Sequence, residues 1–318
     1  MLRLITRAFS PGGAQGNLSV LFFHRVVAER DPLSPDEPTA AEFDRLLGWL
    51  QRQFTVISLS EGVSRLANGN LPPAAAAITF DDGYFDNLSL AAPLLQKRNL
   101  PATLFVATDY IDGGIMFNDM VIEALRKTNL SRLDLSELDL PVFELEDWSQ
   151  RRAAVNAILR AIKHQAPAQR LDTARAVVTR CDVTLPQDLM MSREHLREFS
   201  RHGFEIGAHT GSHPILTKLD DADAYRDIQR SRTWLEECLD RRIGLFAYPN
   251  GKYGQDFDSR HRDMARACGF DAAFSTEPGV CSTAADRWAL PRFTPWDRSP
   301  GRFALRMLAN CRNRPTAA

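Results

Sequence analysis

Two short polar groups in the sequence carry the residue types of a metal-dependent hydrolase. Asp81 and Asp82 stand side by side in TFDDG, and His209 and His213 stand four residues apart in HTGSH. Two imidazoles and one carboxylate make a catalytic zinc set that leaves positions open for water and substrate. Because adjacent side chains diverge along a strand, we expect one carboxylate to bind the metal and the other to act as a base on water.

Each group also has an ordinary structural interpretation. Two histidines at this spacing can lie on a surface loop, which Gly211 and Pro214 favour. Asp-Gly is a common turn dipeptide, and an aspartate can cap a helix. A metal site is favoured because the acidic pair and the histidine pair each follow a separate apolar run.

The apolar pattern around these groups predicts alternating strands and helices. Strands are expected at residues 19–24, 54–58, 76–80, 102–107, 204–209, 244–248, 272–275 and 288–293. Helices are expected at residues 39–50, 59–66, 88–98, 220–239, 257–268 and 302–310. This alternation indicates an α/β fold with parallel strands and crossover helices, closed or nearly closed into a barrel. In such barrels chemistry lies at the C-terminal ends of the strands, where these polar groups stand.

Residues 110–200 interrupt the alternation. Helical stretches at 120–127 and 153–163 surround a polar, acidic segment at 131–148. Because this region lacks strand signals and is short of core residues, we expect a helical insertion on the barrel. The expected organisation is a flexible segment at 1–18, the barrel with its insertion at 19–300, and a helix with a tail at 301–318.

Composition narrows the class of partner. The 318 residues include 40 acidic and 39 basic side chains, so the chain lacks the basic excess typical of nucleic-acid binders. The five cysteines are scattered and form no CxxC pair, which fits a reducing compartment. No apolar run approaches the ~18 residues of a membrane span. Without a clear signal peptide we expect a cytoplasmic protein, while Arg3 and Arg7 leave peripheral membrane contact open.

Three ordered motifs carry a resemblance to a known family. They are ITFDDGYFDN at 78–87, GFEIGAHTGSH at 203–213 and FAYPNG at 246–251. Together they resemble the polysaccharide deacetylases, carbohydrate esterase family 4, which include the nodulation-factor chitooligosaccharide deacetylases. The resemblance covers roughly residues 19–296. It implies a distorted (β/α)7 barrel that removes N-acetyl groups from amino sugars with a divalent metal, zinc by default and cobalt, nickel or manganese otherwise.

The resemblance also assigns roles to matching residues. In the family the first acid of TFDD is the catalytic base and the second is a metal ligand, which implies Asp81 and Asp82 respectively. The two histidines of the family's H-S/T-x-x-H motif complete the metal triad, which implies His209 and His213. The backbone N–H after the proline of the third motif helps to hold the oxyanion, which implies Asn250.

The third motif departs from the family pattern. The usual Arg-x-Pro-Tyr is replaced by FAYPNG, which resembles the branch of the biofilm poly-N-acetylglucosamine deacetylases. Tyr248 in this motif is a candidate substrate contact. Arg292, in ALPRF, is a candidate substitute for the absent arginine that would orient Asp81, the alternative being a surface ion pair. Trp296 is a candidate for stacking on a sugar ring, the alternative being a core aromatic.

The usual source of the general acid is also absent. The family takes it from a C-terminal Leu-x-His motif, but no histidine follows His261. In the biofilm-type branch this histidine comes from an N-terminal strand that ends in Tyr-His, and LFFHR at 21–25 is similar. His24 is therefore the candidate acid, with a structural histidine below the barrel rim as the alternative.

The expected function is a metal-dependent hydrolase that removes N-acetyl groups from an amino-sugar oligomer, polymer or glycolipid. Metal-activated water would attack, with Asp81 as base and His24 as acid. One alternative is a deformylase or deacetylase of a lipid-linked sugar. Another is a barrel that binds glycan without catalysis, which the two altered motifs favour and the four intact metal and base residues oppose.

Overall fold

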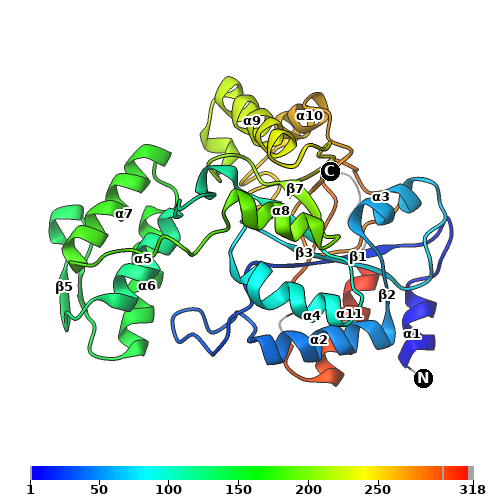
Figure 1. Cartoon of the computed structure of the whole chain (residues 1–318), viewed down its shortest axis with the longest axis horizontal. Helices are drawn as coiled ribbons and strands as arrows, with labels where there is room; N and C mark the ends of the chain where they lie inside the picture. The colour runs from blue at the N-terminus through cyan, green and yellow to red at the C-terminus, as the bar shows by residue number, and fades with distance from the viewer. Residues whose placement is uncertain (1, 296, 314–318) are drawn as a thin grey trace.

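The computed structural model describes residues 2–295 and 297–313 and shows a curled parallel sheet surrounded by helices (Figure 1). The strands are β1 (Leu18–Phe23), β2 (Thr55–Val56), β3 (Ala75–Phe80), β4 (Thr103–Val106), β7 (Glu205–Ala208), β8 (Leu245–Ala247) and β9 (Ala272–Phe274). Their order is β1-β3-β4-β7-β8-β9, with β2 beside β3, and every pair is parallel. The predicted α/β fold, a distorted (β/α) barrel, is confirmed.

The segment at 290–293 joins the two edges of this sheet. Leu290 N–H donates to the Ala273 carbonyl at 2.9 Å, and Phe293 N–H donates to the Val20 carbonyl at 3.0 Å. These are isolated parallel bridges, in place of the strand predicted at 288–293. Pro291 lies between them and has no N–H to contribute to a regular ladder. The barrel is therefore closed by a few hydrogen bonds rather than by a full strand.

Six of the barrel helices lie close to predicted positions. They are α2 (Ala40–Gln53), α3 (Leu59–Ala67), α4 (Ala92–Lys97), α9 (Asp221–Leu239), α10 (Ser259–Ala267) and α11 (Pro300–Arg312). Helix α8 (Arg193–Arg201) was not predicted. Thr39 caps α2 in a capping box with Glu42, as its position before the apolar pattern predicts. The helix predicted at 88–98 begins instead with a π-helical turn at Asn87–Ala91.

Alternate strand residues face two different apolar clusters. In β1, Leu18 and Val20 belong to the cluster inside the barrel, whereas Leu21 and Phe23 pack outward against the surrounding helices. The other strands follow the same period of two. The interior is narrow at Gly207, where a Cβ atom would lie 2.5 Å from the Phe105 ring.

The insertion between β4 and β7 differs from its prediction in three respects. Its elements are α5 (Phe117–Lys127), β5 (Arg132–Asp134), β6 (Val142–Glu144), α6 (Trp148–Ile162) and α7 (Pro167–Cys181). β5 and β6 form an antiparallel pair in a segment expected to lack strands. The insertion also has an apolar core of its own, which includes Val121, Ile158 and Val177. It forms a lobe beside the barrel in Figure 1, and α8 already belongs to the barrel.

The N-terminal segment, expected to be flexible at 1–18, contains a helix among its described residues. Helix α1 (Leu2–Phe9) lies against α11 and α2. Thr6 and Ser10 are fully buried, and the Ser10 hydroxyl donates to Asn17 Oδ1 at 2.6 Å. Over residues 2–295 and 297–313, no helix is both long enough and apolar enough to cross a membrane.

Candidate active site

The inward-facing register of the strands carries polar residues to the C-terminal rim of the barrel. In β1 the inward positions Leu18 and Val20 are followed by Phe22 and, just after the strand, by His24. The same spacing of two leads from Ala77 in β3 to Asp81 and from Gly207 in β7 to His209. A cavity of about 510 Å³, here called the rim cavity, lies at this end and is lined by all three polar residues.

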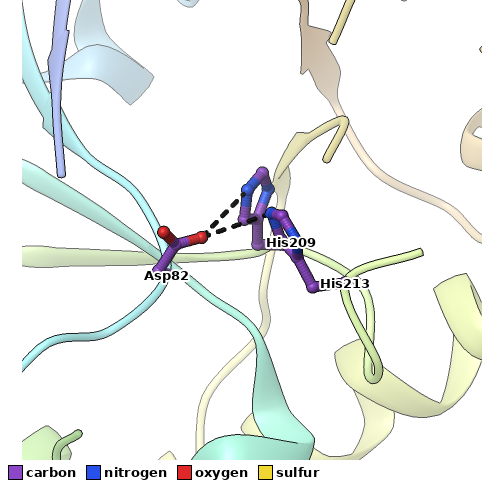
Figure 2. A group of neighbouring side chains, drawn as sticks. All are labelled: Asp82, His209 and His213. Atoms are coloured by element: carbon purple, nitrogen blue, oxygen red, sulfur yellow. Dashed lines mark ion pairs between the residues drawn. The ribbon is translucent and has the colours of Figure 1, made fainter. Parts of the chain in front are cut away.

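Asp82, His209 and His213 point toward one another at the rim (Figure 2). Asp82 Oδ1 lies 3.6 Å from His209 Nε2 and 3.4 Å from His213 Nε2. The three ligand atoms all lie within 4.8 Å of one another. A tetrahedral ion bound at ~2.1 Å holds its ligand atoms about 3.4 Å apart. The group therefore has the size of a set of divalent-metal ligands.

The chemistry of these three residues also fits a metal. Asp82 Oδ1 is buried and has no hydrogen-bond partner within the described part of the chain, an arrangement that is costly unless a ligand satisfies the oxygen. His209 Nδ1 lies 2.7 Å from the Ala247 carbonyl, so it carries the proton and leaves the Nε2 lone pair free. Burial lowers the pKa of His213 to about 4, which keeps this imidazole neutral and able to bind a cation.

The backbone is bent to bring these side chains together. If β3 continued regularly, Asp82 would point away from the interior, opposite to Asp81. Instead Asp82 has a φ of +77°, and Thr210 and His213 in the histidine loop have φ values of +63° and +50°. Asp227 of α9 holds this loop, since its Oδ2 accepts hydrogen bonds from two backbone N–H groups at 3.2 Å. Strained non-glycine residues gathered at one place are typical of a functional site.

Asp81 forms a buried bidentate ion pair with Arg292. Its two carboxylate oxygens lie 2.7 and 2.9 Å from the guanidinium, and both side chains are at most 2% exposed. Burial acts to raise the pKa of Asp81, but the charge and hydrogen bonds of Arg292, together with His209 and His24, outweigh it, so this pKa lies below its usual value. The guanidinium itself lies between the rings of Phe22 and Phe105, at 4.9 and 5.2 Å. The pair is therefore not a surface ion pair, and Asp81 is ionised.

His24 lines the rim cavity together with the metal group. Burial acts to lower its pKa, but the charges of Asp82, Asp81 and Glu37 act in the opposite direction, and the pKa of His24 is raised above its usual 6.5. Glu37 comes from the loop between β1 and α2 and also lines the cavity. The imidazole thus favours its protonated form beside a group of carboxylates, as a proton donor requires.

Asn250 follows β8 and lines the rim cavity. Its φ is +59°, and its carbonyl accepts a hydrogen bond from the Thr276 hydroxyl at 2.6 Å. Its backbone N–H forms no hydrogen bond with any residue that the structure describes. This N–H is therefore available to a ligand.

Tyr248 is not in the rim cavity, contrary to the expected substrate contact. It is fully buried and stacks on Phe257 with a ring-centroid distance of 3.8 Å. Its hydroxyl donates to the Trp288 carbonyl at 2.8 Å. Side chains alternate along β8, and Phe246 faces outward against the helices. Tyr248 lies two residues after Phe246, so it faces the same way and packs in the apolar layer under the helices. Trp296, the expected stacking residue, lies outside the described residues.

The insertion contributes one wall of the rim cavity. Asn118 and Asp119 of α5 line it, and Asp119 accepts a hydrogen bond from the Tyr84 hydroxyl at 2.9 Å. Burial raises the pKa of Asp119 to about 7. Lys163 and Arg170 line the same wall and were not expected from the sequence. They lie in a segment rich in charged and polar residues, where nothing local distinguishes a cavity-facing cation from a solvated one.

Known structures share this fold over nearly the whole chain. The Streptococcus pyogenes deacetylase PplD in complex with acetate superposes with a TM-score of 0.62 at 17% identity, over 92% of this chain and 99% of PplD. IcaB from Ammonifex degensii superposes with a TM-score of 0.61 at 19% identity, over 94% of this chain and 98% of IcaB. At such identities the likeness shows a common fold.

Sequence comparison points to the same group of proteins. YxkH of Bacillus subtilis (strain 168), a polysaccharide deacetylase by name, is 20% identical over 277 residues, which cover 86% of this chain and 70% of YxkH. The profile of the polysaccharide deacetylase family matches residues 68–273, a span that holds Asp81, Asp82, both histidines of the metal group and Asn250. This match extends over more than half of the chain and confirms the resemblance seen in the motifs. The chain belongs to the polysaccharide deacetylase family.

Proposed function

We propose that this deacetylase removes N-acetyl groups from amino sugars of a glycan or glycolipid, with a divalent metal held by Asp82, His209 and His213. The observation that carries the proposal is the convergence of these three ligand atoms in the cavity that also holds Asp81 and His24. When bound, a divalent metal lowers the pKa of water and polarises a carbonyl group. Zinc suits two imidazoles and one carboxylate, and cobalt, nickel and manganese are its competitors.

The chain's own residues supply the proton transfers. Asp81, ionised and held by Arg292, accepts a proton from the water that attacks the acetamide carbonyl carbon. The Asn250 N–H donates to the oxyanion that develops on the carbonyl oxygen. His24 then donates a proton to the sugar nitrogen as the carbon–nitrogen bond breaks. One water is consumed, and the products are acetate and a free amino sugar.

The pKa values of the two proton-transfer groups support these roles. Asp81 has a lowered pKa and is therefore unprotonated before the reaction, whereas the raised pKa of His24 favours its protonated form. Hydrolysis of an amide requires one group that accepts a proton from water and one that donates a proton to the leaving amine. The rim cavity holds an unprotonated carboxylate for the first transfer and an imidazole that favours its protonated form for the second.

The proposal is tested by measuring acetate release from N-acetylglucosamine oligomers of different linkage and length. We expect acetate to appear in equal amounts with new primary amines. A parallel formate assay on N-formylated sugars determines which acyl group is removed. Release of neither acid from any amide-bearing sugar would contradict the proposal.

A further inference from the structure

Two cations from the insertion face the proposed active site. Lys163 follows the last turn of α6, and Arg170 lies in the first turns of α7. Both line the rim cavity with Asp82, His209 and His213. The barrel thus supplies the metal group, whereas the insertion supplies positive charge to the same space.

Arg170 is buried without a carboxylate partner. Its side chain is 7% exposed, Nη1 donates to the Lys163 carbonyl at 3.3 Å, and the guanidinium lies 4.2 Å from the centre of the Phe117 ring. Over the described residues, no acidic group lies within ion-pair distance of Arg170 or of Lys163. Burial lowers the pKa of Arg170, as expected for a cation without a counterion.

The acids of the rim cavity are already engaged elsewhere. Asp81 pairs with Arg292, Asp119 accepts from the Tyr84 hydroxyl, and Glu37 accepts from the Arg25 backbone N–H at 3.3 Å. Asp82 faces the two imidazoles of the metal group. The positive charge at Arg170 is therefore not neutralised by the protein.

A buried charge without a partner is costly, so its presence in a cavity wall indicates a ligand of opposite sign. A guanidinium binds the oxygens of carboxylate and phosphate groups through paired N–H donors, and an ammonium beside it adds charge. We infer that the substrate carries an oxyanion, a carboxylate or a phosphate, on or next to the N-acetylated sugar, and that Arg170 and Lys163 bind it. This inference rests on the proposed function, because it takes the rim cavity as the substrate site.

Binding measurements test the inference independently of catalysis. The probes are N-acetylglucosamine 1-phosphate, N-acetylmuramic acid and neutral N-acetylglucosamine, titrated calorimetrically into the metal-loaded protein. We expect one of the charged sugars to bind more tightly than the neutral one, and the phosphate and carboxylate arms show which oxyanion is preferred. Arg170→Met should lower the affinity for this preferred sugar by about 10-fold or more, because one charge-assisted contact is lost. The affinity for the neutral sugar should not change.

Three further variants keep the test decisive. Arg160→Met removes an exposed arginine of α6 and should change nothing. Arg170→Lys should retain part of the preference, and Lys163→Met gives a second reading if Arg170→Met does not fold. Equal wild-type affinity for all three sugars, or equal losses in Arg160→Met and Arg170→Met, would overturn the inference. Preference for a charged sugar without any release of acetate would contradict the proposed function and support the oxyanion site.

Discussion

Asp81 combines the two properties of a general base in a buried site: it is ionised, and it is held in one orientation by Arg292. Asp81→Asn keeps the shape of the side chain but cannot accept a proton. We expect turnover to fall by about 10²–10⁴-fold, the usual contribution of a general base. Metal content, measured by elemental analysis, should stay unchanged. Loss of the metal in this variant would show that Asp81 is a ligand.

His24 should matter most when the leaving group is poor. An amine must be protonated to leave, whereas the alcohol of an activated ester needs little help. His24→Ala should therefore reduce hydrolysis of an acetamide sugar strongly and that of 4-nitrophenyl acetate much less. Equal losses on both substrates would indicate that His24 only positions the substrate or supports the fold.

The alkaline limb of the pH profile also belongs to His24. As an acid it must be protonated, so kcat/KM should fall as pH rises through its pKa. The charges of Asp82, Asp81 and Glu37 raise this pKa, and a metal bound to Asp82 would cancel the contribution of Asp82. The Glu37 charge contributes to that increase, so Glu37→Gln should move the limb to lower pH. An alkaline limb that is the same in both proteins would show that another group controls it.

The residues predicted most reliably from the sequence are those whose neighbours in the chain fix their geometry. Asp81, Asp82 and His209 directly follow apolar strands, His213 follows His209 in a short loop, and the structure brings all four to one rim as the motifs suggest. Arg170 could not be predicted, because its place in the rim cavity depends on how the insertion packs against the barrel.

At the scale of elements, the segment at 290–293 closes the barrel and delivers Arg292 to Asp81. Arg292→Met would leave the Asp81 charge buried and unpaired. We expect the free energy of unfolding, from urea titration, to fall by about 3–5 kcal/mol. Arg287→Met, at an exposed arginine of the adjoining loop, is the matched control and should cost much less. Similar losses in both variants would mean that the ion pair contributes little.

Element boundaries were predictable where the period of the apolar pattern was long enough to be recognised. Helix α9 and strand β3 lie within one residue of their predicted limits. β5 and β6 have three residues each, too few for an alternation to appear in the sequence. The segment at 288–293 has the apolar composition of a strand, but Pro291 limits it to isolated bridges.

At the scale of the whole molecule, the chain has a barrel and an insertion lobe with separate apolar cores (Figure 1). They meet at the rim cavity and at Arg126 of α5, whose guanidinium binds Asp31 of the β1–α2 loop at 2.7 and 2.8 Å. The core of the insertion could not be predicted from the sequence, because its apolar residues are spread over three helices and two very short strands. The barrel thus supplies the Asp82, His209 and His213 group, and the insertion supplies the cationic wall of the same cavity.

The separate cores predict local rather than global loosening. Ile158 is fully buried in the insertion core, so Ile158→Ala should cost about 2–5 kcal/mol of lobe stability. Hydrogen exchange should accelerate within residues 117–181 while the barrel strands remain protected. Leu130→Ala, at a side chain that is 39% exposed, should have little effect. Faster exchange in β3 and β4 to the same degree would show that the two cores unfold together.

The central claim is that Asp82, His209 and His213 hold a divalent metal on which deacetylation depends. The most direct test is to strip the protein with a chelator, remove the chelator, and follow acetate release from an N-acetylglucosamine oligomer during titration with Zn²⁺. We predict no release at the start and a rise that saturates near one equivalent of metal per chain. Full release by the stripped protein, with no response to added metal, would contradict the claim.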